Sequence, residues 1–315
     1  MQNASAIAQI IQPGLLATLQ DRGRFGHLAE GITTGGPVDE YSFLWGNKLL
    51  SNRAGAAQIE ITLGGFQATI LNSSQMVVCG APMQVELNGN RIPNWLVFDV
   101  GKGDVLTIAP GASGLRSYLA VRGGFVARAV YGSVATVTRD KLGGLNGRGA
   151  ALGVDDVLTA PRDSLPPLLP RRPRTDYVPD YNSESLTIDV IPAGQYSQFS
   201  RPSIDQFFAQ PYTVTAAQDR MGMRLKASHR IDWSHTQILS EPLPIGAIQI
   251  PPDGQPIIML VDRQTLGGYP KIGTVSWRSR CLLGQASAGT QLRLREQSVA
   301  AAQIEWRQFQ RFFSG

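Results

Sequence analysis

Ionisable and amide side chains follow one apolar stretch of the sequence, and they are the first candidates for chemistry. The run from Pro256 to Val261 is one of the longest uninterrupted apolar runs in the chain, and turn residues precede it. This pattern predicts a strand that is buried on both faces. A rigid strand that delivers polar side chains into a glycine loop is a common way to build a site. The candidates delivered here are Asp262, Gln264, Thr265, Gly267, Gly268, Tyr269 and Lys271.

The chemistry that this stretch favours is the binding of a polar or anionic ligand. Glycines let backbone N–H groups approach an anion closely, and Lys271 would add a point charge beside them. At the end of a glycine turn we expect Lys271 to be exposed and to contribute only about 0–1 kcal/mol to stability. The alternative is a hairpin in which Gly267-Gly268 forms the turn and the charges are solvated.

Three further segments place acidic, basic or amide groups beside turns or inside a strand. Asp219 and Arg220 precede a Met-Gly pair, and Gln20, Asp21 and Arg24 flank Gly23. Arginine suits anionic groups, and aspartate can orient a base or an ammonium group. The alternative is that the pairs Asp21–Arg24 and Asp219–Arg220 only brace turns. Glu60 lies in an apolar strand, and periodicity leaves open whether it faces solvent or enters a site.

Several classes of protein are disfavoured by what the sequence lacks. The three histidines have no metal-ligand or triad spacing, and there is no Gly-x-Ser-x-Gly elbow or phosphate loop, so we predict no metal and no independent hydrolase. The net charge of +5 is only mildly basic and comes with no nucleic-acid-binding motif, so we predict no nucleic-acid partner. No segment has the apolar length of a membrane span, and no signal peptide is visible, so we expect a cytoplasmic protein. Cys79 and Cys281 are predicted to be buried thiols.

The elements that position these residues are mostly strands. Short apolar runs spaced by glycine turns between 76 and 160 predict an antiparallel barrel or sandwich, and Gly64-Gly65 predicts a hairpin. Helices are expected from Asp39 to Leu50 and near the C-terminus, where Val299, Trp306 and Phe309 recur at helical spacing. A Pro- and Arg-rich stretch predicts a linker. The expected domains are therefore an N-terminal β lobe (1–163), the linker (164–185) and a C-terminal β lobe with a terminal helix (186–315).

Three stretches carry a long resemblance to a known family. Ser240-Glu241-Pro242, Gly246 to Pro252, and Gln264 to Gly273 resemble signatures of the carboxyltransferase A/B-subdomain family, which contains the C subunit of 5-oxoprolinase, the Kip antagonist and one half of the urea carboxylase carboxyltransferase domain. Gln20 to Arg24 and Asp219-Arg220-Met221-Gly222 also match family motifs. The resemblance implies a mainly β fold with two barrel-like lobes related to the cyclophilin-like fold and a few short helices.

The resemblance also implies a function. As a 5-oxoprolinase C subunit, the chain would act with a subunit-A-like and a subunit-B-like (Kip-inhibitor-like) protein in an ATP-dependent hydrolase that opens 5-oxoproline to glutamate, and it would be inactive alone. ATP would be a cofactor of the assembly. The alternatives are a carboxyltransferase half of a biotin-dependent urea or amide carboxylase, with biotin carried by another protein, and a non-catalytic antagonist that binds a kinase inhibitor.

The candidate residues are therefore expected to share one cleft. We predict catalytic roles for Asp219, Arg220, Asp262 and Lys271, and substrate binding by Gln20, Asp21, Arg24, Gln264, Thr265, Gly267, Gly268 and Tyr269. The predicted substrate is a small lactam or amide, and the predicted state is a hetero-oligomer.

Overall fold

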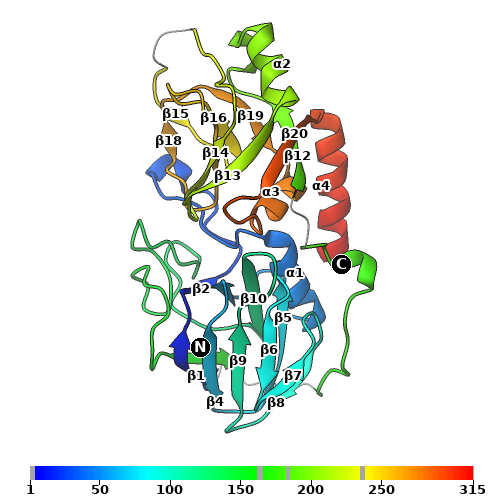
Figure 1. Cartoon of the computed structure of the whole chain (residues 1–315). Coiled ribbons are helices and arrows are strands. Elements are labelled where there is room, and N and C mark those ends of the chain that lie inside the picture. The colour runs from blue at the N-terminus through cyan, green and yellow to red at the C-terminus, as the bar shows by residue number, and fades with distance from the viewer. Residues whose placement is uncertain (1–3, 162–165, 182–184, 235–237, 315) are drawn as a thin grey trace. The chain divides into compact units, whose positions relative to one another are not determined.

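The computed structural model describes residues 4–161, 166–181, 185–234 and 238–314 of the chain. It divides into two compact units, one made of residues 1–25 and 35–182 and the other of residues 26–34 and 183–315. The fold is mainly β, as predicted, and four α-helices occur in the described part (Figure 1). No helix of that part combines the length and apolar composition needed to cross a bilayer.

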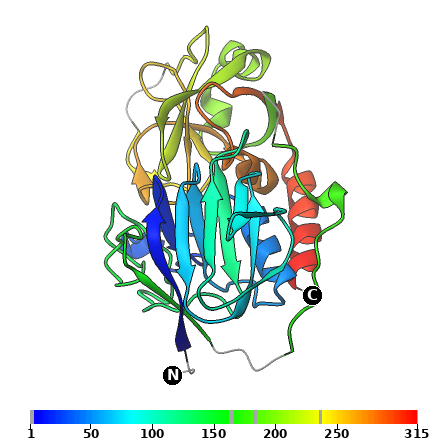
Figure 2. The same ribbon diagram turned by 60° about the horizontal axis from the view of Figure 1, so that its bottom comes forward.

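Two antiparallel sheets form the first unit (Figure 2). One sheet has the order β11 (Val157–Pro161), β1 (Ala4–Pro13), β4 (Phe66–Ile70), β9 (Val105–Ala109), β6 (Gln84–Leu87) and β7 (Asn90–Ile92). The other has the order β2 (Leu16–Gln20), β3 (Gln58–Thr62), β10 (Arg116–Val121), β5 (Ser74–Gly80) and β8 (Phe98–Val100).

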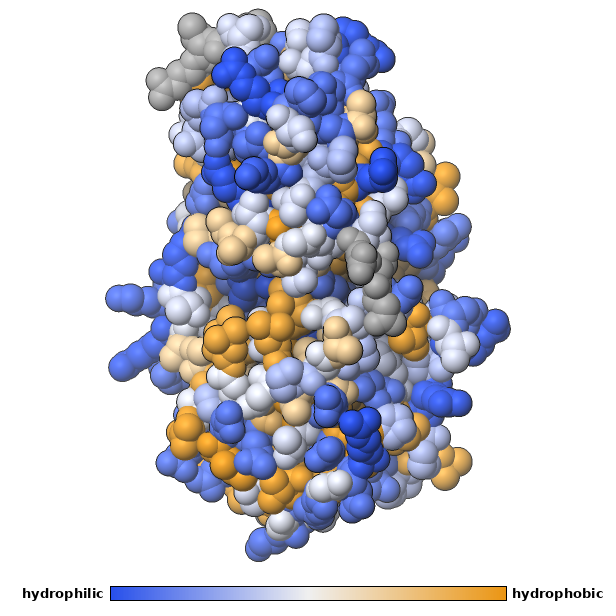
Figure 3. All heavy atoms as spheres, viewed as in Figure 1, coloured by the Kyte–Doolittle hydropathy of each residue, from blue (hydrophilic) through white to orange (hydrophobic). Residues whose placement is uncertain are grey.

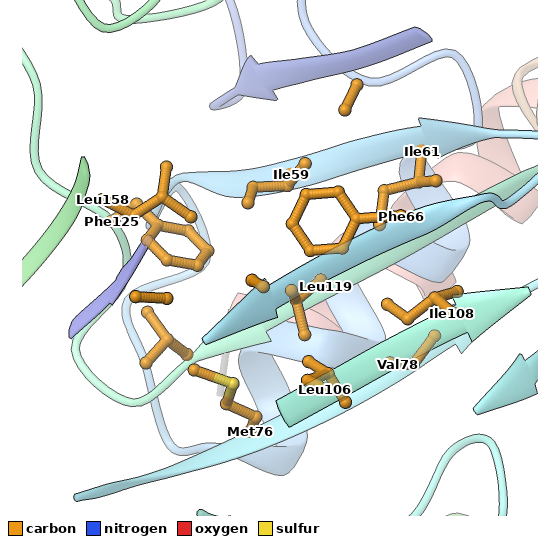
Figure 4. Packing of buried hydrophobic residues seen from close by; sticks show 14 of the residues in the cluster. Ile59, Ile61, Phe66, Met76, Val78, Leu106, Ile108, Leu119, Phe125 and Leu158 are labelled. Carbon is orange, nitrogen blue, oxygen red and sulfur yellow. The ribbon is translucent and has the colours of Figure 1, made fainter. Parts of the chain in front are cut away.

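The core of the first unit is built from both sheets. Alternating residues of β3, β4, β9 and β10 point into one apolar cluster, in which Ile59, Phe66, Leu106 and Leu119 are at most 2% exposed (Figure 4). Full burial of side chains of this size stabilises a fold by about 1.5–3 kcal/mol each. The cluster therefore fixes the register of both sheets.

The Gly64-Gly65 hairpin prediction is wrong. The strands on either side of these glycines, β3 and β4, pair with other strands and belong to different sheets. Both glycines have positive φ, and a Cβ on neighbouring Gly14 would lie 2.3 Å from the Gly64 carbonyl oxygen. The glycines therefore let two sheet-to-sheet crossings pass closely, which a local turn pattern cannot distinguish from a hairpin.

The helix α1 (Glu40–Leu49) confirms the predicted early helix. Asp39 caps it by accepting a hydrogen bond from the Ser42 backbone N–H (3.1 Å). At its other end Arg171 donates to the Leu49 carbonyl oxygen (2.5 Å), so the Pro/Arg-rich segment contacts this unit. The 3-10 helix η2 (Thr175–Tyr177) lies in the same segment.

A closed barrel of seven strands forms the second unit (Figure 1). Its order is β12 (Ser185–Pro192), β19 (Lys271–Val275), β16 (Ala247–Gln249), β17 (Ile257–Met259), β14 (Gly222–Lys226), β13 (Pro211–Gln218) and β20 (Gln291–Glu296). The β12–β20 pair is parallel and closes the barrel. A small sheet adds β15 (Glu241–Pro242) and β18 (Leu266–Gly267). The remaining elements are η1 (Leu28–Glu30), η3 (Tyr196–Gln198), α2 (Arg201–Ala209), α3 (Trp277–Leu283) and α4 (Val299–Ser314).

Residues 26–34 belong to the second unit although they lie early in the chain. The Thr33 hydroxyl donates to the Arg263 carbonyl oxygen over 2.7 Å. Arg263 follows the predicted central strand, which is confirmed as β17 but is shorter than its apolar run. An early segment thus supports the stretch that carries most of the candidate residues.

The surface agrees with the scattered charge of the sequence. On the face shown in Figure 3, hydrophobic residues form small groups among hydrophilic ones. Many arginines form ion pairs, as with Arg22–Glu40 (3.2 Å) and Arg295–Asp189 (2.6 Å). Both cysteines are buried, as predicted.

Candidate functional site

Polar groups converge in the second unit where β19 begins. Lys271 is the first residue of β19 and lies opposite Gln249 on β16. Gly267 of β18 lies opposite Glu241 of β15. Residues directly opposite in an antiparallel pair place their Cβ atoms about 4.5–5.5 Å apart. The strand register therefore brings together residues that are up to 30 positions apart in the chain.

Lys271 is buried rather than exposed, so the expectation for this residue is wrong. It is 7% exposed, and its ammonium group donates to Glu241 Oε1. Gln195 Nε2 donates to the same oxygen over 2.6 Å, and Gln195 Oε1 accepts from the Lys271 backbone N–H over 2.9 Å. The hydrogen bond from Lys271, aided by that from Gln195, holds the pKa of Glu241 below its ordinary value of 4.5. Glu241 and Gln195 were not among the predicted site residues.

A third missed residue, Gln249, lies beside this cluster. It is 2% exposed, and its side-chain Nε2 has no hydrogen-bond partner in the described part of the chain. A Cβ placed on Gly267 would lie 2.7 Å from this nitrogen and 2.6 Å from Leu243 Cδ1. Gly267 has no positive φ, so a Cβ at this position would not strain the backbone but would push aside the ends of Gln249 and Leu243.

Arg220 and Asp262, both predicted to be catalytic, bind each other. Arg220 Nε lies 2.9 Å from Asp262 Oδ2, and Nη2 lies 3.0 Å from Oδ1. The two residues are 8% and 5% exposed, and the Asp262 backbone N–H donates to the Arg220 carbonyl oxygen over 2.9 Å. This two-pronged ion pair joins the β13–β14 turn to the end of β17.

Asp219 has a turn-forming contact instead of pairing with its neighbour. Its Oδ1 accepts from the backbone N–H groups of Met221 (2.7 Å) and Gly222 (3.1 Å), and the residue is exposed. The alternative prediction, in which Asp219 pairs with Arg220 to stabilise the turn, is therefore wrong, since Arg220 pairs with Asp262 instead.

The remaining candidates of the second unit lie shortly before Lys271 in the chain. Gln264, Thr265 and Gly268 are half-buried, and Tyr269 is 44% exposed. The Thr265 carbonyl oxygen accepts from the Leu243 backbone N–H over 2.9 Å. Tyr269 and Gln264 thus lie on a loop whose backbone is fixed by β15 and β18.

The first-unit candidates form a separate group that holds one loop. Asp21 accepts from the Ser133 hydroxyl (2.5 Å) and the Val134 N–H (2.9 Å). Arg24, which is 1% exposed, donates to the Ala135 carbonyl oxygen (2.6 Å). Gln20 donates to the Thr136 carbonyl oxygen (3.1 Å). These contacts describe a scaffold for residues 133–136, and the cleft shared with the second unit stays a prediction.

A buried acidic network in the first unit answers the open question about Glu60. Glu60 is 1% exposed, and its Oε2 accepts from Tyr118 Oη (2.8 Å) and the Val38 N–H (2.9 Å). Tyr118 Oη in turn accepts from the Asp39 N–H (2.8 Å). Burial, and then the charge of Glu60, raise the pKa of Tyr118 well above its ordinary value. The network fixes the start of α1 against the sheet.

The absence of a metal stays a prediction. No group of three or more His, Cys, Asp or Glu residues in the part that the structure describes has the arrangement of a metal site.

Comparison with known proteins decides the family. The family described as "Carboxyltransferase domain, subdomain A and B" matches residues 30–296. The chain belongs to this family. It is 32% identical over 286 residues to the C subunit of 5-oxoprolinase from Haemophilus influenzae, a match that covers 91% of this chain and 90% of the relative. It is 31% identical to the C subunit of 5-oxoprolinase from Escherichia coli, over 97% of this chain and 96% of the relative.

Larger proteins contain a region similar to this chain. The structure of the K. lactis urea amidolyase superposes with a TM-score of 0.89 at 26% identity, over 98% of this chain. The chain spans only 20% of that protein. Likewise, the match to urea amidolyase of Saccharomyces cerevisiae, at 28% identity, covers 16% of the relative.

Proposed function

We propose that this chain is the C subunit of an ATP-dependent 5-oxoprolinase, which opens 5-oxoproline to L-glutamate together with the A and B subunits. The observation that carries the proposal is the pair of relatives named as C subunits of 5-oxoprolinase, each matched over at least 90% of its own length. The chain corresponds to only about a sixth of each urea amidolyase relative.

The reaction needs groups that hold an amide while its carbonyl is attacked. A lactam carbonyl is a weak electrophile because amide resonance stabilises it, and ATP in such an assembly would remove that resonance by phosphorylating the oxygen. Lys271 and Arg220, the cations assigned to anions, are each bound to a carboxylate, Glu241 and Asp262. Because each cation is already paired with a carboxylate, these two clusters do not fit a triphosphate. We therefore assign no ATP-dependent step to this chain and propose that its polar residues bind the lactam.

Reconstitution tests the proposed function. The tagged chain is expected to copurify with a subunit-B-like protein. The three subunits together are expected to form glutamate from 5-oxoproline only in the presence of ATP, and omission of any subunit should abolish the product. A chain that converts 5-oxoproline alone would contradict the proposal, as would glutamate formation that is unaffected by its omission.

The second candidate function is the carboxyltransferase half of a biotin-dependent urea or amide carboxylase. The observation in its favour is the TM-score of 0.89 to the K. lactis urea amidolyase. Biotin would then arrive on another protein. Carboxylation of urea by this chain with a biotinylated partner, and no glutamate formation with the A and B subunits, would favour this alternative.

A further inference from the structure

The side chain of Gln249 has a hydrogen-bond donor that the fold leaves unused. It lies on β16 and is 2% exposed, yet its Nε2 has no partner among the described residues. Leaving a buried donor unsatisfied costs about 1–3 kcal/mol, whereas an apolar side chain of similar shape would remove that cost. Buried groups of this kind in a folded protein need an explanation, and a ligand is one.

Gln249 lies among the polar residues of the Lys271–Glu241–Gln195 cluster. The residue lies opposite Lys271, and its Nε2 is held over Gly267, where the position of an added Cβ would be only 2.7 Å away. Gly267 itself lies opposite Glu241. The unused donor is therefore adjacent to the Lys271–Glu241–Gln195 cluster.

The second half of the site is the Oε2 atom of Glu241. Lys271 and Gln195 both donate to Oε1, and no donor in the described ranges binds Oε2. The carboxylate side chain is 36% exposed, so an outside N–H group can reach it. Since Lys271 and Glu241 neutralise each other, the cluster offers one donor and one acceptor without surplus charge.

We propose that Gln249 and Glu241 together bind the amide group of the substrate, and this inference rests on the proposed function. Gln249 Nε2 donates to the amide carbonyl oxygen, and Glu241 Oε2 accepts from the amide N–H. A lactam or a urea presents a C=O acceptor and an N–H donor along one edge, the chemical complement of this donor and acceptor. A phosphate is anionic and would be repelled by the Glu241 carboxylate, so the site selects the amide end of the substrate.

The test measures binding of a neutral lactam to the full chain. 2-Pyrrolidone is the probe, cyclopentanone is the neutral analogue without the N–H group, and inorganic phosphate is the anion. Ligand-observed NMR is expected to show binding of 2-pyrrolidone alone. Gln249→Met removes the donor at similar volume and is expected to weaken binding about tenfold or more, with a melting temperature no lower than that of the wild type.

Gln210→Met is the matched control. Gln210 is also a buried glutamine of the second unit, at 7% exposed, but its amide is paired: Nε2 donates to the His229 carbonyl oxygen (2.9 Å) and Oε1 accepts from the His229 N–H (3.1 Å). Its replacement is expected to lower the melting temperature and to leave lactam binding unchanged. The two variants therefore separate a ligand-binding amide from a structural one.

Four results would overturn the inference: no binding of 2-pyrrolidone to the wild type, binding by Gln249→Met within twofold of the wild type, displacement of the lactam by phosphate, or a melting temperature of Gln249→Met well below that of the wild type. The proposed function is judged separately. If the reconstituted subunits form glutamate equally well with Gln249→Met, the inference fails and the function stands. If the wild-type chain binds the lactam through Gln249 but the subunits form no glutamate, the function fails and the amide site stands.

Discussion

Breaking the buried ion pair between Arg220 and Asp262 tests whether these residues serve the fold or the reaction. The pair has two short contacts, of 2.9 and 3.0 Å, and both side chains are less than 10% exposed. Asp262→Leu would leave a guanidinium group buried without its carboxylate. Removal of one partner of a buried pair typically costs about 3–5 kcal/mol. For a unit of domain size this corresponds to a fall in melting temperature of about 6–20 °C.

The double variant Arg220→Met/Asp262→Leu provides the contrast. Replacing both charges with apolar groups is often neutral or stabilising, so we expect its unfolding free energy to lie within about 1 kcal/mol of the wild type. The difference between the double variant and the sum of the single variants gives the coupling energy, which we expect to exceed about 2 kcal/mol. Urea unfolding of the four proteins at pH 7, followed by the fluorescence of the second unit, measures these quantities.

Two results would contradict this reasoning in different ways. A cost below about 1 kcal/mol for Asp262→Leu would mean that water solvates the pair, as at an exposed ion pair. A double variant that is as stable as the wild type but supports no glutamate formation in the reconstituted assembly would instead return Arg220 and Asp262 to a catalytic role. A stable, active double variant would confirm a purely structural pair.

Three further predictions concern the other clusters. Arg24→Met should destabilise the first unit by about 3 kcal/mol or more, because a buried guanidinium that donates to backbone carbonyl oxygens is lost, and hydrogen exchange should rise in residues 130–136. The lowered pKa of Glu241 means that its pair with Lys271 contributes stability above about pH 4.5, and this stability is lost as the pH falls through the folded-state pKa. In Glu241→Gln the urea unfolding midpoint should therefore depend less on pH between pH 6 and 3 than it does in the wild type. The same pH dependence in both proteins would contradict this. Gly267→Ala should weaken lactam binding, because its Cβ would displace the Gln249 amide, whereas Gly268→Ala, whose Cβ would lie no closer than 3.4 Å to a neighbour, should leave binding unchanged.

The elements that local patterns specify were predictable. Asp39 precedes an amphipathic run and caps α1, and Asn88-Gly89 joins β6 and β7 with two positive φ values, as a two-residue hairpin turn requires. The crossing at Gly64-Gly65 was not predictable, because the same positive-φ pair suits a hairpin and a passage between sheets. Which strand a segment pairs with depends on distant residues, and no local pattern records that.

For the C-terminal helix, too, the local pattern predicts the element but not which of its residues are buried. The helix α4 is confirmed, and Phe309 packs on Trp277 with ring centroids 3.5 Å apart. Trp306, which was expected on the buried face, is 47% exposed, and Val299 is 55% exposed. Helical spacing identifies an apolar face, but the part of that face that is covered depends on the neighbour.

The site was predicted in part. Lys271 was identified from the glycine loop, but its partner Glu241 lies 30 residues earlier, and their contact depends on the pairing of β15 with β18 and of β16 with β19. The signal that could have found the missed residues was the family resemblance itself. Glu241 and Gln249 both lie in stretches that match the family, outside the glycine loop that carried the prediction.

The three candidate cations donate hydrogen bonds to different kinds of acceptor, and this difference bears on the reaction. Arg24 donates to backbone carbonyl oxygens, Arg220 to a buried carboxylate, and Lys271 to a carboxylate that is partly open to solvent. In the last arrangement Glu241 Oε2 has no donor among the described residues, so it can accept from another molecule. A ligand there meets a carboxylate already oriented by Lys271 and Gln195, so it gains a fixed acceptor without ordering a flexible side chain. The proposed amide site would use this acceptor to recognise an N–H group beside a carbonyl, with Lys271 holding Glu241 ionised and in place.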